Sequence, residues 1–346
     1  MTLPRLGVVI VTYDSAAVIL DCLESLLAAT GLRLDIVLVD NGSTDGTPAL
    51  LRGWAAGGAR PGPAPALPFA LAAAARPLPL DGAEGPSGHA VTLVEAGLNA
   101  GFAAGVNRGL ETLAARPGGG PDRVWILNPD TAVPPATPAA FATAPEPAGG
   151  FSVMSGRMAY LETPEQIQID GGTLDRRTGV TGNIHLGRPL AATPPPPAEA
   201  LDFVMGGSMV TSRAFRAAAG PMPEDYFLYY EEVDWAMRRG ALPIAYCAEA
   251  VVYHRAGSAI GSPTLARPAS PFSLYFKHRG RIRFVRRHLP RALPGALAYS
   301  LAKAAQLGLR GFRAEARALL AGSLGLPPPR AVRGRLSPEA ARRAFG

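Results

Sequence analysis

The first half of the chain alternates between continuous apolar runs and stretches with an apolar residue every three or four positions. Residues 6–13 (LGVVIVTY) form an uninterrupted and largely β-branched apolar run, which is typical of a strand buried on both faces. The same pattern predicts further strands at residues 34–40, 91–95 and 124–128. Because these runs alternate with helical patterns, they favour a parallel sheet with right-handed crossovers.

Two helices are predicted between these strands. The first follows Ser15, its expected N-cap, and stops at Gly31; its apolar stripe consists of Ile19, Leu23, Leu26 and Leu27. The second covers residues 102–115. The expected fold class is therefore α/β, with a Rossmann-like, mostly parallel sheet flanked by helices.

The second half has shorter and more varied patterns. Strands are predicted at residues 152–160, 202–211, 244–247 and 250–254, with a turn-linked pair across 171–186. Helices are predicted at residues 231–239 and 272–288, followed by a softer helical stretch over 293–320. Residues 55–90 are rich in Ala, Pro and Gly and have no periodicity, which predicts a mobile surface insertion.

Charge is distributed unevenly along the chain, whose net charge is +7. Residues 267–346 hold 17 Lys and Arg residues against only Glu315 and Glu339, while the preceding residues are net acidic. A basic segment of this kind indicates an anionic partner, either a membrane surface or a polyanionic acceptor, unless the charges are simply solvated. No nucleic-acid-binding motif accompanies the charge, so nucleic acid is not expected as a partner.

Other features bear on location. No uncharged apolar run reaches the roughly 18–20 residues that a spanning helix needs, and no signal peptide is apparent. A cytoplasmic protein is therefore expected, peripheral at the inner face of the cell membrane if the basic helices bind lipid. Cys22 and Cys247 lie far apart in apolar surroundings, which predicts buried thiols of a reducing compartment and neither a disulfide nor a zinc site.

Polar segments follow the strands of the first half. They are residues 12–15 (TYDS), 40–46 (DNGSTDG), 99–102 (NAGF) and 128–131 (NPDT). In an open parallel sheet the carboxyl ends of the strands share one edge, where ligands bind. Carboxylates, glycines and a helix N-terminus at that edge suit a nucleotide diphosphate. Any one segment is equally well explained as a turn or cap, but four in register are not.

Asp130 carries the clearest chemistry in this half. An aspartate at a strand end can bind a hard divalent cation that also holds diphosphate oxygens. The alternative is that Asn-Pro-Asp-Thr serves only as a turn and cap. The neighbouring polar segments favour the metal site.

A second chemical feature is the run 226–235 (YFLYYEEVDW), where aromatic residues precede Glu231, Glu232 and Asp234. Acidic residues in a first helical turn complement the helix dipole, which explains part of the pattern. A carboxylate beside apolar rings can also have its pKa raised, as a general base for a hydroxyl requires. Downstream, His254 at a strand end is either structural or completes a metal–diphosphate site.

Taken together, these motifs resemble glycosyltransferase family 2, whose members are inverting enzymes of the GT-A fold. The resemblance covers residues 6–260 apart from the 55–90 insertion. It rests on the succession VVIVTYDS, VDNGSTDGT, NAGFAAGVNRGL, ILNPDT, GGSMVTSRAF, YFLYYEEVDWAMRRG and VVYHRAGS.

The resemblance also implies a domain organisation. A GT-A catalytic domain would cover residues 1–265, with a nucleotide-sugar-binding half at 1–131 and an acceptor and catalytic half at 150–265. A basic helical extension would follow at 266–346.

By position, the resemblance implies a donor site at the carboxyl edge of the sheet. Three residues would hold the base and ribose: Thr12, Asp14 and Asp40. Three more would line the donor pocket: Asn99, Gly101 and Asn107. The donor would be a dTDP-, UDP- or GDP-linked sugar.

The resemblance implies a metal site and a catalytic pair as well. Asp130 matches the second acidic residue of the family's DXD element and, with His254, would bind Mg²⁺ or Mn²⁺. Glu232 matches the general base and Glu231 precedes it. Two departures matter: Asn128 replaces the first Asp of DXD, and Glu232 stands where Asp is commoner, so both glutamates are candidates for the base.

The expected function is metal-dependent, inverting transfer of a sugar to a hydroxyl of a glycan or lipid-linked acceptor. The YYEEVDW form and the Arg-rich tail most resemble rhamnosyltransferase-type members that act on cell-envelope glycans. One alternative is a catalytically inactive glycan-binding homologue, which would lose the base or the metal ligand. The other is a sugar nucleotidyltransferase, whose first strand would lead into a Gly-rich, Arg/Lys-bearing loop that Tyr13-Asp14-Ser15 does not resemble.

Overall fold

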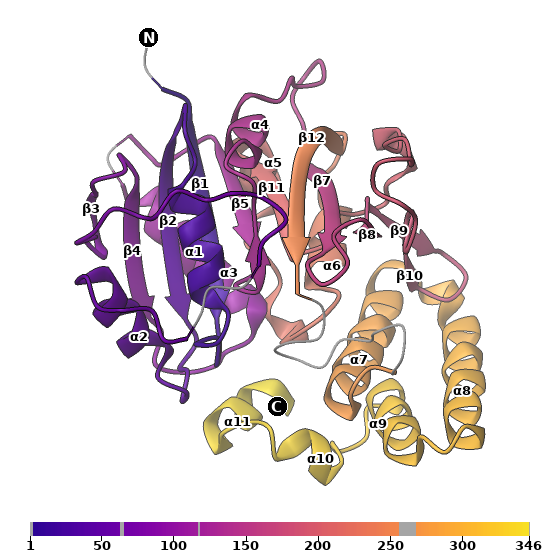
Figure 1. Ribbon diagram of the computed structural model, residues 1–346. Coiled ribbons are helices and arrows are strands. Elements are labelled where there is room, and N and C mark those ends of the chain that lie inside the picture. Colours follow the sequence, from indigo (N-terminus) through magenta and orange to yellow (C-terminus); the bar gives the residue numbers. More distant parts are fainter. Residues whose placement is uncertain (1–2, 63–65, 117, 256–267, 346) are drawn as a thin grey trace.

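The computed structural model describes residues 3–62, 66–116, 118–255 and 268–345. Within them a ten-stranded sheet runs in the order β3-β4-β2-β1-β5-β11-β7-β12-β6, with β8 pairing β7 (Figure 1). Its strands are β1 (Arg5–Thr12), β2 (Arg33–Asp40), β3 (Asp81–Glu84), β4 (Ala90–Glu95), β5 (Arg123–Leu127), β6 (Thr131–Ala132), β7 (Val153–Tyr160), β8 (Ile167–Ile169), β11 (Ser208–Ser212) and β12 (Ala245–His254). A separate hairpin joins β9 (Gly172–Asp175) and β10 (Val180–Asn183).

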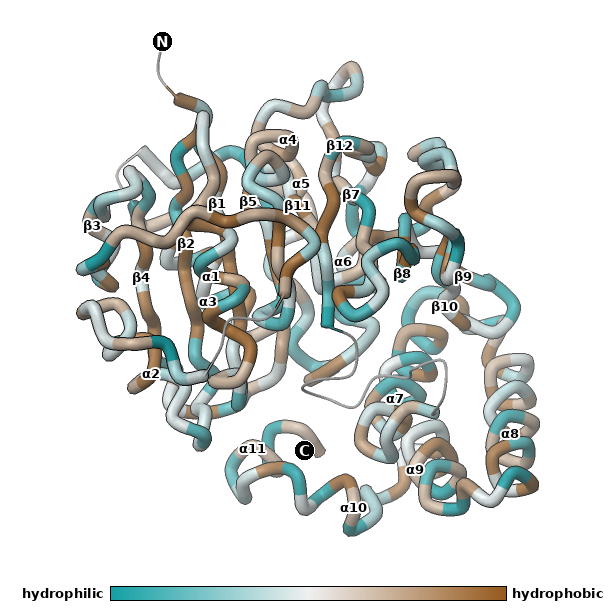
Figure 2. The backbone as a smooth tube through the Cα atoms, viewed as in Figure 1, coloured by the Kyte–Doolittle hydropathy of each residue, from teal (hydrophilic) through white to brown (hydrophobic). Residues whose placement is uncertain are grey.

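The parallel half of the sheet forms as predicted. β4, β2, β1 and β5 run parallel to one another, and their residues are mostly buried. In Figure 2 much of the tube along these strands is brown, the hydrophobic end of the scale. β11 is antiparallel to both of its neighbours, so β7 and β12 again point the same way as β5. The predicted α/β class with a mostly parallel sheet is confirmed.

Helices cover both faces of the sheet because strand side chains alternate in direction. One face packs on α1 (Ile19–Leu27), α2 (Thr47–Ala55) and α4 (Thr137–Thr143). The other packs on α3 (Phe102–Ala114), α5 (Arg213–Ala219) and α6 (Glu231–Met237). Along β1, for example, Val8 and Ile10 belong to the first core and Val9 and Val11 to the second.

The start of α1 differs from the prediction. Val18 is the N-cap, and no side chain caps the helix. The carbonyl oxygen of Ser15 accepts hydrogen bonds from the backbone N–H groups of Val18 and Ile19, which forms a turn before the helix. Ser15 therefore contributes its backbone, while its hydroxyl donates to the carbonyl of Tyr13.

Three boundaries in the second half also differ. The strand predicted at 202–211 is shorter, since only β11 joins the main sheet and Phe203 instead bridges Gly172. The strands predicted at 244–247 and 250–254 are one strand, β12, with an irregularity inside it. The helical stretch at 293–320 is two helices, α8 (Leu293–Leu309) and α9 (Arg313–Leu324), separated at Gly311, whose φ is +88°.

The segment 55–90, predicted as a surface insertion, is tied to the sheet in its described part. β3 pairs with β4 and forms the edge of the sheet, and Leu78 is buried in the core beside α2. Arg60 forms ion pairs with Asp21 and, at 3.1 Å, with Glu24 on α1. The hydrophobic periodicity of the sequence could not predict these contacts, because isolated side chains make them and no repeating pattern is involved.

The C-terminal helices lie beyond the carboxyl ends of the strands (Figure 1). They are α7 (Pro271–His288), α8, α9, α10 (Arg330–Arg333) and α11 (Pro338–Phe345), and a short 3₁₀ turn, Pro290–Ala292, lies between α7 and α8. Two further 3₁₀ turns, Ala198–Ala200 and Glu224–Tyr226, occur earlier in the chain. α7 is close to its predicted bounds and is largely buried. Among the helices of the described ranges, none is both long and apolar enough to cross a membrane.

Candidate functional site

The loops after β1 and β2 are locked to each other at the carboxyl edge. Asp40 is 2% exposed and accepts hydrogen bonds from the Thr12 hydroxyl at 3.0 Å and the Ser43 hydroxyl at 2.5 Å. Its second oxygen accepts from the backbone N–H groups of Gly42 and Ser43. The structure thus places Thr12 and Asp40 together as predicted, but it uses the Asp40 carboxylate to shape the loop.

Asp14 lies on the exposed side of the same loop pair. Its φ of +49° turns the chain away from β1, and its backbone N–H donates to the Ser43 hydroxyl at 2.9 Å. Its carboxylate accepts from the backbone N–H of Thr44 at 2.7 Å. An acidic side chain held at the open edge of two strands is well placed for hydroxyl or N–H groups of a bound nucleoside.

The loop before α3 connects the first half to the aromatic run. The Asn99 side chain accepts from the Gly101 N–H at 3.1 Å, and the Asn41 side chain donates to the Gly101 carbonyl at 2.9 Å. Gly101 has a φ of +100°, and a Cβ there would lie 2.6 Å from the Phe227 carbonyl oxygen. Only glycine fits this position. The N–H of Phe102 donates to that same Phe227 oxygen at 2.9 Å.

Asn107 is more enclosed than a pocket-lining residue. Its amide donates to the Met222 carbonyl and to the Glu224 carboxylate, both at 2.9 Å, and its oxygen accepts from the Met222 N–H. These bonds attach α3 to the segment before the aromatic run. The geometry favours a structural role for Asn107.

Asp130 and His254 are brought together by strand pairing. β6 follows β5 after three residues, yet it pairs with β12, so that His254 lies opposite Thr131. In the sheet, β11, β7 and β12 lie between β5 and β6. Because the three-residue link allows Leu127 and Thr131 to be at most ~14 Å apart, the sheet must curl so that the end of β12 comes close to the end of β5. Asp130 Oδ1 then lies 3.2 Å from His254 Nε2, and both residues are more than nine-tenths buried.

The surroundings of His254 determine its protonation and orientation. Burial lowers the pKa of His254, but the nearby Asp130 carboxylate outweighs it, and the pKa lies above the ordinary histidine value. The Nδ1 atom lies 2.8 Å from Oε1 of Gln168. Since an amide oxygen can only accept, Nδ1 carries a proton in this contact, and Nε2 is the nitrogen directed at Asp130.

These two side chains fit a hard cation that is shared with a substrate. Carboxylate oxygen and imidazole nitrogen are both suitable ligands for Mn²⁺, and Mg²⁺ commonly takes one or two carboxylates plus phosphate oxygens. In the described ranges no group of three or more His, Cys, Asp or Glu side chains is arranged to hold a metal ion. A cation here would therefore need the oxygens of a diphosphate or water to complete its coordination.

The two candidate bases begin α6 after an unusual backbone. Phe227, Tyr229 and Tyr230 have φ values of +66°, +67° and +75°. Such values are uncommon for bulky side chains and persist where the surroundings hold them, often at functional sites. Here the Tyr229 and Tyr230 hydroxyls donate to the Ser273 hydroxyl and to the Gly179 carbonyl.

Glu231 and Glu232 occupy different environments. Glu231 is 3% exposed, and within the described part of the chain its Oε2 has no hydrogen-bond partner. Glu232 is half-buried. Burial raises the pKa of both carboxyls, and the neighbouring Glu232 raises that of Glu231 further. Of the two, Glu232 is the more accessible to an acceptor.

The Gly206–Gly207 turn lies between the metal-binding candidates and the glutamates. The Gly207 carbonyl accepts from the N–H of Asn128, in the loop that carries Asp130, at 3.0 Å. A Cβ on Gly206 would lie 3.7 Å from Cβ of Glu232. The turn therefore brings α6 next to the loop after β5.

Asp234, the third acidic residue of the run, is structural. Its side chain is fully buried and accepts from Tyr226 at 2.7 Å, Arg238 at 2.9 Å and Arg287 at 2.7 Å. His288 lies 3.0 Å away. Two of these partners are on α7, so Asp234 attaches the C-terminal helices to α6.

Two residues near the site were not expected from the sequence. Gln168 lies on β8, where no motif marks it. Lys277 lies on α7, and its positive charge lowers the pKa of Glu232 against the effect of burial. Lys277 and Lys303 are the only lysines in the chain, and that rarity was the one signal available.

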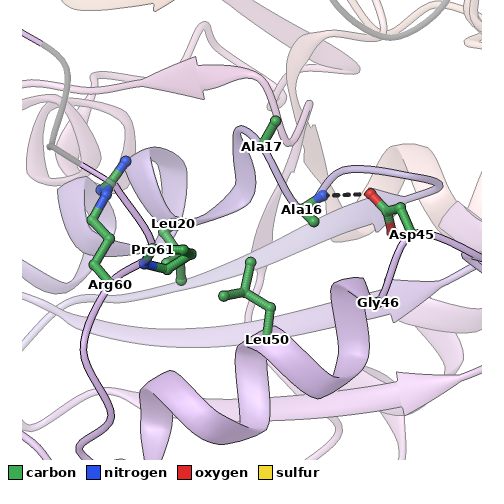
Figure 3. A pocket seen from close by; sticks show the side chains of 8 residues that line it. All are labelled: Ala16, Ala17, Leu20, Asp45, Gly46, Leu50, Arg60 and Pro61. Atoms are coloured by element: carbon green, nitrogen blue, oxygen red, sulfur yellow. Dashed lines mark hydrogen bonds between the residues drawn. The ribbon is translucent and has the colours of Figure 1, made fainter.

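A hollow of about 410 Å³ lies beside the first two loops (Figure 3). Its charged side chains are Asp45 and Arg60; the rest are small or apolar (Ala16, Ala17, Leu20, Gly46, Leu50 and Pro61). Asp45 accepts from the Ala16 N–H and from Thr47. The hollow lies on the α1–α2 side and is lined by none of the residues expected to act on a donor.

Both cysteines are free and buried, as predicted. Burial raises the pKa of Cys22 to about 12, which keeps its thiol protonated and unreactive. The Ala256, Gly257 and Ser258 positions of the last motif lie outside the described residues, as does the predicted domain boundary at 265.

The architecture is that of the GT-A class of glycosyltransferase folds. The chain is similar to the structure "Mannosyltransferase PcManGT from Pyrobaculum calidifontis in complex with GDP-Man and Mn2+", with a TM-score of 0.52 at 18% identity, covering 94% of this chain and 87% of that one. It is also similar to "Crystal structure of GalNAc-T7 with UDP, GalNAc and Mn2+", with a TM-score of 0.50 at 12% identity, covering 91% of this chain and 55% of that one.

A family model agrees over a shorter range. The model described as Glycosyl transferase family 2 matches residues 7–63, which include the first two polar segments. No curated protein matches the chain. At these identities the structural similarities establish the fold, and the activity is argued below from the site.

Proposed function

We propose that this protein is a metal-dependent, inverting glycosyltransferase of family 2 that transfers a sugar from a nucleotide diphosphate to an acceptor hydroxyl. The main support is that the Gly206–Gly207 turn contacts both candidate sites: Gly207 accepts a hydrogen bond from Asn128, in the loop that carries Asp130, and Gly206 lies beside Glu232. A cation-binding pair beside a carboxylate with a raised pKa is what diphosphate departure and hydroxyl deprotonation require.

Each part of the site has a role in this proposal. The loops joined by Thr12 and Asp40, with Asp14 at their open side, hold the nucleoside. Asp130 and His254 hold Mg²⁺ or Mn²⁺, and the bound cation supplies charge neutralisation for the departing diphosphate. Glu232 removes the proton from the acceptor hydroxyl, which attacks the anomeric carbon from the face opposite the diphosphate. Glu231 precedes it, with a pKa raised by burial and by the neighbouring Glu232.

The donor and acceptor can be narrowed only by resemblance. Both similar structures carry a nucleotide or nucleotide sugar with Mn²⁺ in their names, which supports that donor class here. Rhamnose on a dTDP carrier, and a cell-envelope glycan or glycolipid as acceptor, are proposed from the YYEEVDW form and the basic tail. A cytoplasmic location, where such donors are made, belongs to the same proposal.

A panel of nucleotide sugars tests the proposal directly. The intact protein is incubated with dTDP-, UDP- and GDP-linked sugars in Mn²⁺, Mg²⁺ or EDTA, and binding and slow donor hydrolysis are measured. We expect one donor to bind and to be hydrolysed only with a divalent cation. Binding of glycans without any donor turnover would instead support an inactive homologue. Release of pyrophosphate from a nucleoside triphosphate and a sugar phosphate would support a nucleotidyltransferase.

A further inference from the structure

Helix α8 has two dissimilar faces. Its buried face consists of small or apolar residues that pack toward the rest of the C-terminal helices: Ala296, Ser300, Ala304 and Leu307. The opposite face is exposed and almost entirely apolar: Pro294, Ala298, Leu301, Ala302, Ala305 and Leu309. Because helical positions three and four apart share a face, these exposed residues form one continuous strip.

The leucines of this strip are unusually accessible. Leu309 is 90% exposed and Leu301 is 57% exposed. α8 is on the outside of the C-terminal helices in Figure 1, and Figure 2 shows hydrophobic residues along it. On the adjoining helix α9, Leu324 is also half-exposed, at 50%. An apolar strip on an outer helix indicates a surface that is covered in use.

The surroundings of the strip are basic. Arg291 precedes α8, and Arg310, Arg313 and Arg317 follow it; all four are exposed. α8 itself contains no acidic residue, and Glu315 is the only one near it in sequence. Charge complementarity therefore selects an anionic partner, and the apolar strip selects one that accepts hydrocarbon.

The basic helix α7 is engaged elsewhere. Arg281 is 2% exposed and donates to the Thr178 and Ala296 carbonyls. Arg287 and Arg283 pair with Asp225, and Arg279 donates to the Ala344 carbonyl. Four of the five arginines of α7 are thus engaged within the protein, Arg286 alone among them is left to solvent in the described ranges, and the apolar residues of the helix are mostly buried, so α7 offers lipid no apolar face.

We propose that the exposed face of α8 binds an anionic lipid surface. Leu301 and Leu309 enter the boundary between headgroups and acyl chains, while Arg310, Arg313 and Arg317 lie among the phosphates. Amphipathic helices with basic residues beside an apolar face lie in the membrane interface in this way, with the apolar face toward the acyl chains. The inference does not depend on sugar transfer, because it rests on a surface apart from the carboxyl edge.

Vesicle co-sedimentation of the full chain tests the proposal. Vesicles of phosphatidylglycerol mixed with phosphatidylcholine are compared with pure phosphatidylcholine at low and high salt. We expect binding to the anionic vesicles that weakens as salt is raised. Absence of binding to anionic vesicles at low salt overturns the proposal.

Matched variants localise the binding surface. Leu301→Asp with Leu309→Asp should reduce partitioning at least tenfold, and Arg313→Gln with Arg317→Gln should reduce it severalfold. The control is Leu186→Asp with Arg188→Gln, since Leu186 is 52% exposed and lies on the hairpin side of the molecule. Far-UV circular dichroism verifies folding, which these exposed positions should not disturb.

A second copy of this chain is the alternative occupant of the strip. Size-exclusion chromatography with light scattering separates the two. A wild-type dimer that the α8 variants convert to monomers, while vesicle binding persists, overturns the lipid proposal. A monomer whose vesicle binding is lost in the α8 variants and retained in the control supports it.

Discussion

Nε2 of His254 lies 3.2 Å from Oδ1 of Asp130, and the two residues come from strands that β6–β12 pairing joins. The contact puts an imidazole beside the carboxylate at the end of β5, where a departing diphosphate would lie. In the proposed function, this pair would supply two protein ligands for a cation although Asn128 stands in place of an acidic residue.

Removing the charge at either side of the proposed site should abolish most activity. Asp130→Asn and Glu232→Gln should each lower kcat by on the order of 10²-fold, because one weakens cation binding and the other removes the proton acceptor. Steady-state kinetics with the donor identified above measures this. Asp122→Asn and Glu111→Gln are controls, since both side chains are largely exposed. If kcat is unchanged in Asp130→Asn or in Glu232→Gln, the residue replaced does not have the role proposed for it.

The pH dependence of kcat/KM should reflect the pKa of Glu232 and the effect of Lys277 on it. Burial raises the pKa of Glu232, and Lys277 lowers it, so a general base here loses its proton above the ordinary glutamate range. Replacing Lys277 with Met removes the opposing charge and should move the acidic limb of kcat/KM to higher pH. Lys303→Met, at the only other lysine, should leave the limb in place because Lys303 contacts Gln306. If the acidic limb does not move in Lys277→Met, Lys277 does not influence the pKa of the general base.

Gln168 should position His254 for the cation. Its Oε1 lies 2.8 Å from Nδ1, and loss of such a partner typically weakens metal binding by about 10- to 100-fold. Gln168→Leu should therefore raise the Kd for Mn²⁺ measured by titration calorimetry in the presence of a nucleoside diphosphate. Gln166→Leu, two residues away, is the matched control. Equal Mn²⁺ affinity in wild type and Gln168→Leu would contradict the positioning role.

Asp234 should matter for stability. Burial raises its pKa, but hydrogen bonds from His288, Tyr226 and Arg287 outweigh it, and the pKa lies below the ordinary value. A lowered pKa means that the stabilisation is present above the ordinary aspartate pKa and is lost as pH falls through the folded-state value. Asp234→Asn should reduce the free energy of unfolding by about 3 kcal/mol at neutral pH. It should also flatten the acid side of the stability profile, measured by urea denaturation.

The fold could be predicted where a pattern repeats over many residues. Strands buried on both faces read as unbroken apolar runs, so β1, β2, β4 and β5 are within about two residues of their expected bounds. β3 was missed because Asp81–Glu84 is mostly exposed and pairs only at the sheet edge. The short β6 has two residues, too few for any periodicity.

The site could be predicted less completely, for a different reason. Motifs identify residue types, and the structure brings Asp130 to His254 and Thr12 to Asp40 as expected. A motif does not reveal which polar atoms already form hydrogen bonds within the protein. Asn107 and Asp234 form such bonds with neighbouring segments. Gln168 was invisible because its contact depends on strand pairing between distant parts of the chain.

The left-handed backbone at Phe227, Tyr229 and Tyr230 has a consequence for any shortened version of the protein. α7 braces that stretch: a Cβ on Gly280 would lie 2.6 Å from the Tyr229 carbonyl oxygen, and Phe276 packs on Phe227. A fragment that ended before Pro271 would keep every proposed reacting group but would lose the α7 contacts that hold this backbone in place. It would also lose Arg287 and His288, which hold Asp234, so the fragment should be both less stable and less active than the full chain.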